Sequence, residues 1–161
     1  MQDHRREIEE VVLRYCRGVD RADLELVRSA YHPDAVEHHP GFDGTFAEYM
    51  IWLETTIAKY DGLMHIVGNH LSTVKGDRAV AETYAMGVHW AGAIDDERNF
   101  TSGIRYIDRM ERRASRWAIA ERWVLREWVR SEVNLFVPPG DVPRGTRDDS
   151  DELCRSLEWL D

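Results

Sequence analysis

The second half of the chain carries four long runs rich in β-branched and aromatic residues, over residues 65–74, 79–90, 99–110 and 117–128. Short turns join the first run to the second and the third to the fourth, and an acidic loop over residues 92–98 joins the middle pair. Strands with short connections pair as antiparallel neighbours. The runs therefore predict an antiparallel meander, and a sheet of such long strands twists and curls strongly.

The first sixty residues instead carry the signals of helices. Asp3 can cap the first helix, whose apolar side chains recur at helical spacing, and Gly18 loosens its end. A second, short helix through residues 24–30 is expected to stop at His32-Pro33, because the residue before a proline disfavours the helical conformation.

An extended piece is expected to begin at residues 35–36, and a loop is expected over residues 41–44. Thr45 and Glu48 then form a capping box, and the third helix that they open breaks at residues 61–62. Helices followed by a long twisted sheet indicate the α+β class. We predict a cone-shaped, curved antiparallel sheet with N-terminal helices that close a pocket.

The length of 161 residues suits one domain with a substantial core. We expect this domain to cover residues 1–135. Residues 136–161 form a polar C-terminal tail with a possible short helix over residues 151–159. The tail is expected to pack on the domain or on a neighbouring subunit.

Acidic residues outnumber basic ones, with 30 Asp and Glu against 21 Lys and Arg, so the formal net charge is −9. Such a charge repels nucleic acid and anionic membrane surfaces, so neither is an expected partner. The first residues lack a signal-peptide core, and no apolar run is long enough to span a bilayer. The expected location is the cytoplasm.

Six tryptophans and six tyrosines are many for this length, and they indicate large apolar surfaces that face a cavity or a partner subunit. A homo-oligomer, either a dimer or a trimer, is expected. The two cysteines, Cys16 and Cys154, have no metal-binding or redox spacing and are expected to be reduced thiols.

An aspartate at the end of the first helix and a histidine at the start of the first long strand, Asp20 and His65, are candidates for one site. A carboxylate can fix the tautomer of an imidazole, whose other nitrogen then moves a proton. Two structural alternatives remain open. Asp20 could cap the second helix, and His65 could be a hydrogen-bonded core histidine.

The seven histidines raise the question of a metal site. None has the His-Glu-x-x-His spacing of a helical zinc site, and His65 and His70 point to opposite faces of a strand. The sequence also lacks a glycine-rich phosphate loop. We therefore expect no metal and no cofactor.

Several segments together resemble the SnoaL-like group of the nuclear transport factor 2-like superfamily: RYCRGVDRAD, YHPDAVEHH, MHIVGNH, and RYIDRMERR followed by WAIAERWVLREW. The resemblance extends to about Trp128. It implies a cone-shaped α+β barrel with a deep, mostly apolar pocket. This scaffold carries cyclases, isomerases, dehydratases, hydrolases and non-catalytic subunits, so the fold alone does not name a reaction.

Three enzyme families of this group share an Asp-His pair. The resemblance to scytalone dehydratase implies that Asp20 and His65 act together and that His89 is a further site residue. In hexachlorocyclohexane dehydrochlorinase the same pair abstracts a proton, but its lysine five residues before the aspartate is Tyr15 here.

Bile acid 7α-dehydratase has a tyrosine at that position. The resemblance implies a tyrosine, aspartate and histidine set of Tyr15, Asp20 and His65, and it places an arginine of the last strand at Arg126, with Arg122 as the near alternative. The second catalytic aspartate of that family has no counterpart here.

The leading hypothesis is a cofactor-independent, dehydratase-like lyase that acts on a small hydrophobic or polycyclic molecule with a carbonyl group. His65 would be the base and then the acid, Asp20 would orient it, and Tyr15 would bind the oxygen where charge develops. The predicted substrate-binding residues are His89, Arg122, Arg126, Trp52, Tyr84 and Trp90.

Other readings share the same residues. An isomerase or a polyketide-type cyclase needs the same proton transfer. A non-catalytic ligand-binding or structural subunit, like the β subunit of a ring-hydroxylating dioxygenase, would instead fill the cone with side chains. Tyr15 would then serve packing alone, and arginines of the strands, such as Arg105 and Arg122, could face either way.

Overall fold

The computed structural model describes residues 3–92, 98–131, 146–150, 154 and 157. The elements are α1 (His4–Asp20), α2 (Leu24–Ser29), β1 (Tyr31–His39), β2 (Phe42–Thr45), α3 (Phe46–Ile57), β3 (Gly62–Lys75), β4 (Arg78–Trp90), β5 (Phe100–Arg113) and β6 (Arg116–Ser131). Most of the acidic loop and of the tail lies outside the described residues, and so does the expected helix over residues 151–159 except for Cys154 and Leu157.

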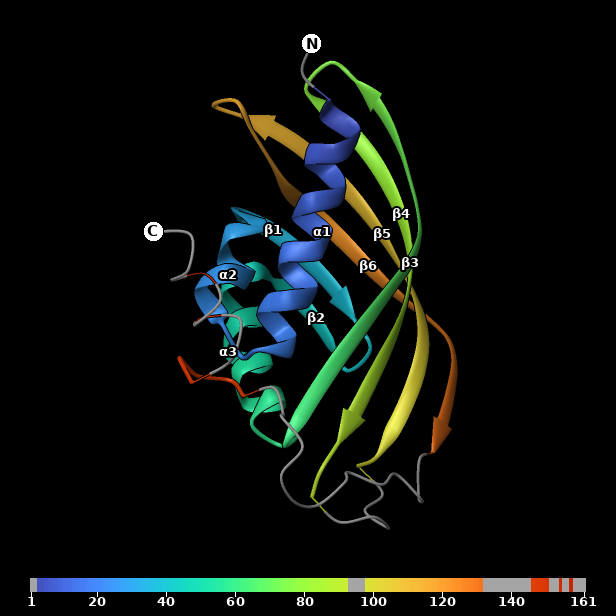
Figure 1. Ribbon diagram of the computed structural model, residues 1–161. Coiled ribbons are helices and arrows are strands. Elements are labelled where there is room, and N and C mark those ends of the chain that lie inside the picture. Colours follow the sequence, from blue (N-terminus) through green and yellow to red (C-terminus); the bar gives the residue numbers. More distant parts are fainter. Residues whose placement is uncertain (1–2, 93–97, 132–145, 151–153, 155–156, 158–161) are drawn as a thin grey trace.

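The six strands form one curved, open sheet in the order β2-β1-β6-β5-β4-β3. Strands β3 to β6 are the predicted antiparallel meander. Helices α1, α2 and α3 lie on the concave side of this sheet (Figure 1). The predicted α+β class, with a curved sheet and helices at the N-terminal end of the chain, is confirmed.

One strand pair differs from the expected antiparallel arrangement, because β1 runs parallel to β6. This strand begins at Tyr31, directly after α2, instead of at residues 35–36. Pro33 lies in the irregular part of the pairing, where the register shifts between Tyr31 and Val36. A proline is tolerated there because it has no N–H to donate to a regular ladder. Part of the expected loop over residues 41–44 is likewise the short strand β2.

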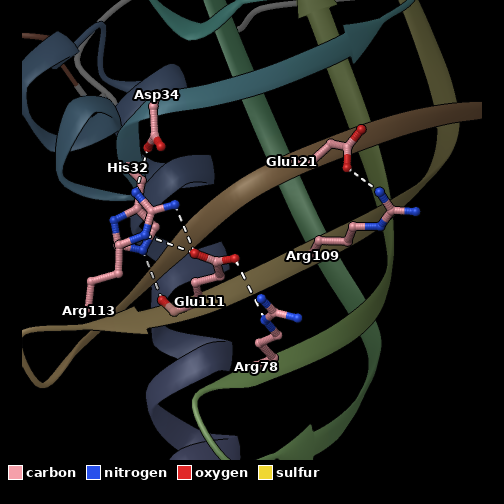
Figure 2. A network of polar contacts seen from close by, with 7 residues as sticks. All are labelled: His32, Asp34, Arg78, Arg109, Glu111, Arg113 and Glu121. Carbon is pink, nitrogen blue, oxygen red and sulfur yellow. Dashed lines mark hydrogen bonds and ion pairs between the residues drawn. The ribbon is translucent and has the colours of Figure 1, made fainter.

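A network of polar side chains ties β1 to the β5–β6 hairpin (Figure 2). The guanidinium of Arg113 donates to Asp34 over 2.6 Å and to Glu111 over 2.8 Å. The ring of His32 donates to the backbone carbonyl of Glu111 over 2.9 Å. Exposed ion pairs add little stability individually, so the network mainly positions β1 beside its parallel neighbour.

The core lies between the inner face of the sheet and the buried face of α1. The apolar side chains whose helical spacing predicted α1 are buried there, namely Ile8, Val11, Val12 and Tyr15. The third helix packs on β1 and β2, and its capping box between Thr45 and Glu48 is formed as predicted. In the described part of the chain, none of the helices combines the length and apolar content needed to span a bilayer.

A charged pair lies inside this core. Arg122 of β6 and Asp108 of β5 have fully buried side chains, at 0% exposure each. The guanidinium donates two hydrogen bonds to the carboxylate, over 2.6 and 2.7 Å. It also lies 4.2 Å from the ring centroids of both Tyr15 and Tyr106. A cation between two aromatic faces is stabilised by their quadrupoles.

A second buried acid lies close to this pair. Glu37 of β1 is fully buried, and its Oε2 accepts a hydrogen bond from the Tyr31 hydroxyl over 2.9 Å. Burial raises the pKa of this carboxyl from 4.5 to about 8, although Arg122 and the Tyr31 hydrogen bond act in the opposite direction. Glu37 therefore carries a proton at neutral pH.

We expect the Arg122→Gln variant to lose about 3–5 kcal/mol of unfolding free energy, because it leaves the Asp108 carboxylate buried and unpaired. Urea denaturation measures the loss. The control is Arg109→Gln, which breaks a surface ion pair with Glu121 and should cost less than about 1 kcal/mol. Similar small losses in both variants would contradict the burial argument.

The proton on Glu37 predicts a pH dependence of stability. In the unfolded chain this carboxyl titrates near its ordinary pKa of 4.5, and in the folded protein near about 8. Between these values the folded protein binds the extra proton, so the contribution of Glu37 to the unfolding free energy falls as the pH rises. The maximum slope is about 1.4 kcal/mol per pH unit.

The Glu37→Gln variant is neutral at every pH and should lack this slope. Urea denaturation of both proteins between pH 5 and pH 8.5 measures the difference, with the variant gaining relative stability toward high pH. Parallel stability curves for the two proteins would show that Glu37 ionises normally in the folded state.

Candidate active site

Asp20 and His65 are in direct contact. Asp20 is the last residue of α1, and His65 lies on the inner face of β3. The ring Nδ1 of His65 donates to Asp20 Oδ1 over 2.6 Å, and the backbone N–H of His65 donates to Oδ2 over 2.9 Å. An ionised carboxylate only accepts hydrogen bonds, so the proton of a neutral His65 ring is on Nδ1. Its Nε2 is then free to accept a proton.

The end of α1 explains how the aspartate reaches β3. Gly18 permits α2 to pack closely, because a Cβ atom there would lie 2.7 Å from Val27 Cγ2. Asp23 caps α2, and its side chain accepts from the Leu26 amide over 2.9 Å. The alternative in which Asp20 caps α2 is therefore wrong, and its carboxylate is available to His65.

A cavity of about 270 Å³ lies beside the dyad. Its wall includes aromatic side chains from several elements: Trp52 of α3, Tyr60 in the connection to β3, and Phe100 of β5. His65 is part of this wall, and its side chain is 8% exposed. The nitrogen that can accept a proton is thus next to a space that can hold a small molecule.

Gly87 of β4 keeps the space in front of His65 open. A methyl group on Gly87 would lie 3.7 Å from His65 Nε2, 3.6 Å from Ser102 Oγ and 3.3 Å from His89 Cε1. An atom of a bound molecule over Gly87 would therefore be near a base, a hydroxyl group and a second imidazole. The three side chains come from different strands, and the sheet pairing brings them to one point.

Two further histidines line the cavity, and both are uncharged at neutral pH. His89 stacks on Phe100 with 4.1 Å between ring centroids, and its buried Nδ1 has no hydrogen-bond partner among the described residues. His39 donates from Nδ1 to the Pro40 carbonyl over 3.1 Å. Burial lowers the pKa of each ring to about 4, and the positive charge of Arg126 acts in the same direction.

Tyr15 lies behind the dyad. Its ring approaches that of His65 with 6.5 Å between centroids, but its hydroxyl is buried and hydrogen-bonded to the Tyr49 hydroxyl over 2.7 Å. Burial raises the pKa of Tyr15 well above its ordinary value. The expected placement of this hydroxyl in the pocket is not observed, because the buried face of α1 directs it into the core.

The two arginines predicted on the last strand have different surroundings. Arg126 lines the cavity, whereas Arg122 is in the core with Asp108 and does not reach the cavity. The expectation that Arg122 contacts a substrate is corrected accordingly. Arg105 faces outward and pairs with Glu82 over 2.6 Å.

Only some of the residues predicted to form the substrate-binding wall line the cavity, because alternation along the strands places the others on the outer face of the sheet. Trp52 and His89 line the cavity as expected. Tyr84 lies on the outer face of the sheet and is 44% exposed. Trp90 is an even number of residues from Tyr84 on β4, so it shares the outer face, and its ring covers Gly62. Neither Tyr84 nor Trp90 lines the cavity, and both placements correct the sequence expectation.

Other lining residues were not predicted, and they include His39, Tyr60, Phe100, Ser102 and Tyr106. Alternation on the third predicted strand places Phe100, Ser102 and Tyr106 on one face. The sequence alone could therefore have indicated that these three residues line the cavity together. His39 and Tyr60 lie at the ends of elements, where alternation says little.

One residue of the tail contacts the domain next to the dyad. Arg147 donates from Nε to the backbone carbonyl of Asp20 over 3.3 Å, and from Nη1 to that of Tyr60 over 3.2 Å. These contacts join the end of α1 to the connection before β3. Arg147 thus bridges two segments beside the dyad.

In the described part of the chain, no three His, Cys, Asp or Glu side chains are grouped to hold an ion. The pair at His38 and Asp43 lies outside the cavity, with 2.7 Å between Nδ1 and Oδ2. Both described cysteines are free thiols.

Comparison with known proteins supports the fold at low sequence identity. A protein assigned as a scytalone dehydratase from Novosphingobium aromaticivorans is 18% identical, with a TM-score of 0.70, over 83% of this chain and 88% of that chain. The hexachlorocyclohexane dehydrochlorinase LinA-type3 from Novosphingobium barchaimii is 19% identical, with a TM-score of 0.70, over 84% and 95% of the two chains. A protein of cystatin-like fold from Nostoc punctiforme is 17% identical, with a TM-score of 0.63, over 75% and 89%.

Among curated proteins no sequence matches this chain significantly. The SnoaL-like domain family, in contrast, matches residues 2–123, which include both members of the dyad and most of the cavity wall. This chain therefore belongs to the SnoaL-like family, within the nuclear transport factor 2-like superfamily.

Proposed function

We propose that the protein is a cofactor-independent lyase of the dehydratase type. The observation that carries the proposal is the contact between Asp20 and His65 at the wall of a cavity. The similarity in fold to proteins assigned as a scytalone dehydratase and a hexachlorocyclohexane dehydrochlorinase supports an elimination reaction. Such reactions begin with removal of a proton from carbon.

In the proposed reaction, His65 Nε2 takes a proton from the carbon next to a substrate carbonyl. Asp20 stabilises the imidazolium that forms, because its carboxylate already accepts the Nδ1 proton. The electron pair of the C–H bond forms a C=C bond as the bond from the neighbouring carbon to its hydroxyl breaks. The imidazolium returns the proton to the departing oxygen, and water leaves.

Ser102 is the better candidate to bind the substrate oxygen, in the role first expected of Tyr15. Its Oγ and His65 Nε2 lie at nearly equal distances, 3.6 and 3.7 Å, from the position of a methyl group on Gly87. A hydroxyl near a developing negative charge stabilises the transition state. His89 also lines the cavity, and its neutral ring can offer a second hydrogen bond.

The cavity volume limits the substrate. Pockets for drug-sized ligands occupy about 300–1,000 Å³, and this cavity has about 270 Å³. A molecule of about one or two rings fits that space better than a large polycyclic molecule. The aromatic wall favours a flat, mostly apolar body.

An isomerase or a cyclase with the same dyad is the alternative within enzyme chemistry, since each uses the same first proton transfer. The non-catalytic alternative requires a cone filled by side chains and a His65 bonded to backbone groups. The open cavity and the carboxylate on the His65 ring favour the enzyme.

We expect Asp20→Asn and His65→Ala each to lower kcat/KM by about 10²–10⁴-fold, because general base catalysis is lost while the cavity remains. The assay follows formation of a conjugated carbonyl from β-hydroxy ketones of one or two rings. Deuterium exchange into the same ketones in heavy water reports the proton transfer when elimination does not follow.

The chain offers a matched control for this pair. His38 and Asp43 form the same kind of contact on the surface, so His38→Ala and Asp43→Asn remove equivalent groups away from the cavity. These variants should keep full activity. Unchanged turnover and exchange in the Asp20 and His65 variants, with the fold retained by circular dichroism, would refute the proposed role of the dyad.

We also propose that the outer face of the sheet binds a second copy of this chain. Large apolar side chains are exposed there, and they are Met64, Ile66, Leu71, Val80, Tyr84, Met86, Leu125 and Trp128. The charged groups among them are neutralised locally, since Arg105 pairs with both Glu82 and Glu127. Two acidic copies can therefore meet at this face without burying unpaired charge.

Light scattering should show a dimer or trimer for the native protein and a shift toward monomer for Ile66→Glu. The control is Ile51→Glu, because Ile51 is exposed on α3, away from the sheet face. A native monomer at micromolar concentration, or an equal effect of both substitutions, would contradict this interface.

A further inference from the structure

The charge of the cavity wall differs from that of the whole protein. The chain has an excess of acidic residues, with a formal net charge of −9. Among the described residues that line the cavity, however, Lys59 and Arg126 are cations and none is an aspartate or glutamate. Asp20 is not part of the wall, and its two oxygens each accept a hydrogen bond from His65. A cation-lined cavity in an acidic protein indicates an anionic ligand.

Arg126 is one of the two cations of the wall that are available to such a ligand. It follows Arg122 and Val124 on the inner side of β6, at alternate positions. Arg122 is neutralised by Asp108, and the outward Arg105 and Arg109 are also paired with carboxylates. No such ion pair involves Arg126 within the described residues. Arg126 lines the cavity and is exposed, so its guanidinium is available to a bound molecule.

The other polar groups of the wall do not supply charge. Burial keeps His39 and His89 neutral, since the pKa of each ring is lowered to about 4. Both rings line the same cavity as Arg126. A negative group bound beside Arg126 would thus meet a cation and two uncharged hydrogen-bonding rings.

We propose that the cavity binds a small ring-containing carboxylate, whose anionic group contacts Arg126 while its ring lies between the aromatic wall and His65. A planar guanidinium matches a carboxylate with two parallel hydrogen bonds. The ring would contact Trp52, Tyr60 and Phe100. Identification of this ligand as the substrate rests on the proposed lyase function, but its binding does not.

The test compares two probes that differ only in charge, naphthalene-2-carboxylate and naphthalene-2-carboxamide. Calorimetric titration at pH 7.5 and low salt gives their affinities, and shifts of the Gly87 and Ser102 backbone amide resonances in NMR spectra report binding in the cavity. We expect the native protein to bind the carboxylate at least about tenfold more tightly than the amide, as for a charge-assisted hydrogen bond.

The Arg126→Gln variant should bind the carboxylate as weakly as the amide and should bind the amide as the native protein does. Arg126→Lys keeps the charge and should retain part of the preference. The control is Arg109→Gln, which removes the same charge from the outer side of the sheet and should leave both affinities unchanged. Equal affinities in the native protein, an unchanged preference in Arg126→Gln, or no binding of either probe would overturn the proposal.

Failure of this proposal can be told apart from failure of the lyase function. If the carboxylate preference depends on Arg126 but no hydroxy ketone is turned over or exchanged, the subsite stands and the reaction does not. If neutral ketones are turned over with a requirement for Asp20 and the probes bind equally, the reaction stands and the subsite does not.

Discussion

The contact between Asp20 and His65 is the interaction on which the site depends. One carboxylate accepts both the ring N–H and the backbone N–H of the same histidine, so it restrains the position of the ring as well as its tautomer. The contact also joins the end of α1 to the beginning of β3, and Arg147 donates a hydrogen bond to the backbone carbonyl of Asp20 at the same end of α1. The position of α1 therefore affects the orientation and the reactivity of the His65 imidazole.

Behind the dyad the core is unusually polar. Arg122 is fully buried with Asp108 and lies between the rings of Tyr15 and Tyr106, and Tyr15 in turn contacts the ring of His65. Burying a charged pair costs desolvation free energy. Hydrogen bonds and aromatic contacts offset this cost only where their geometry is good. This cluster is thus sensitive to small shifts of β5 and β6. Tyr106 lines the cavity, whereas the charged pair of Arg122 and Asp108 supports the site from the core.

The cavity combines a restrained base with a cationic wall that mixes polar and aromatic side chains. Gly87 leaves room in front of His65 Nε2, and the neutral rings of His39 and His89 can exchange hydrogen bonds without adding charge. Together with Lys59, Arg126 can compensate a negative charge on a bound molecule. Proton abstraction produces such charge, so the same residue would help both in binding and in stabilising the reacting state.

The sequence by itself determined the helices, the four-strand meander and the candidates Asp20 and His65, because these follow from local signals: capping residues, helical spacing, alternation and turns. Only the tertiary structure decided that Asp23 rather than Asp20 caps α2, that β1 pairs parallel to β6, and that Arg122 enters the core while Arg126 faces the cavity. Tyr84 and Trp90 were misplaced because alternation gives two faces of a strand without saying which one is inside. That choice depends on how a curved sheet and three helices share one core, which is a property of the whole chain and of no single segment.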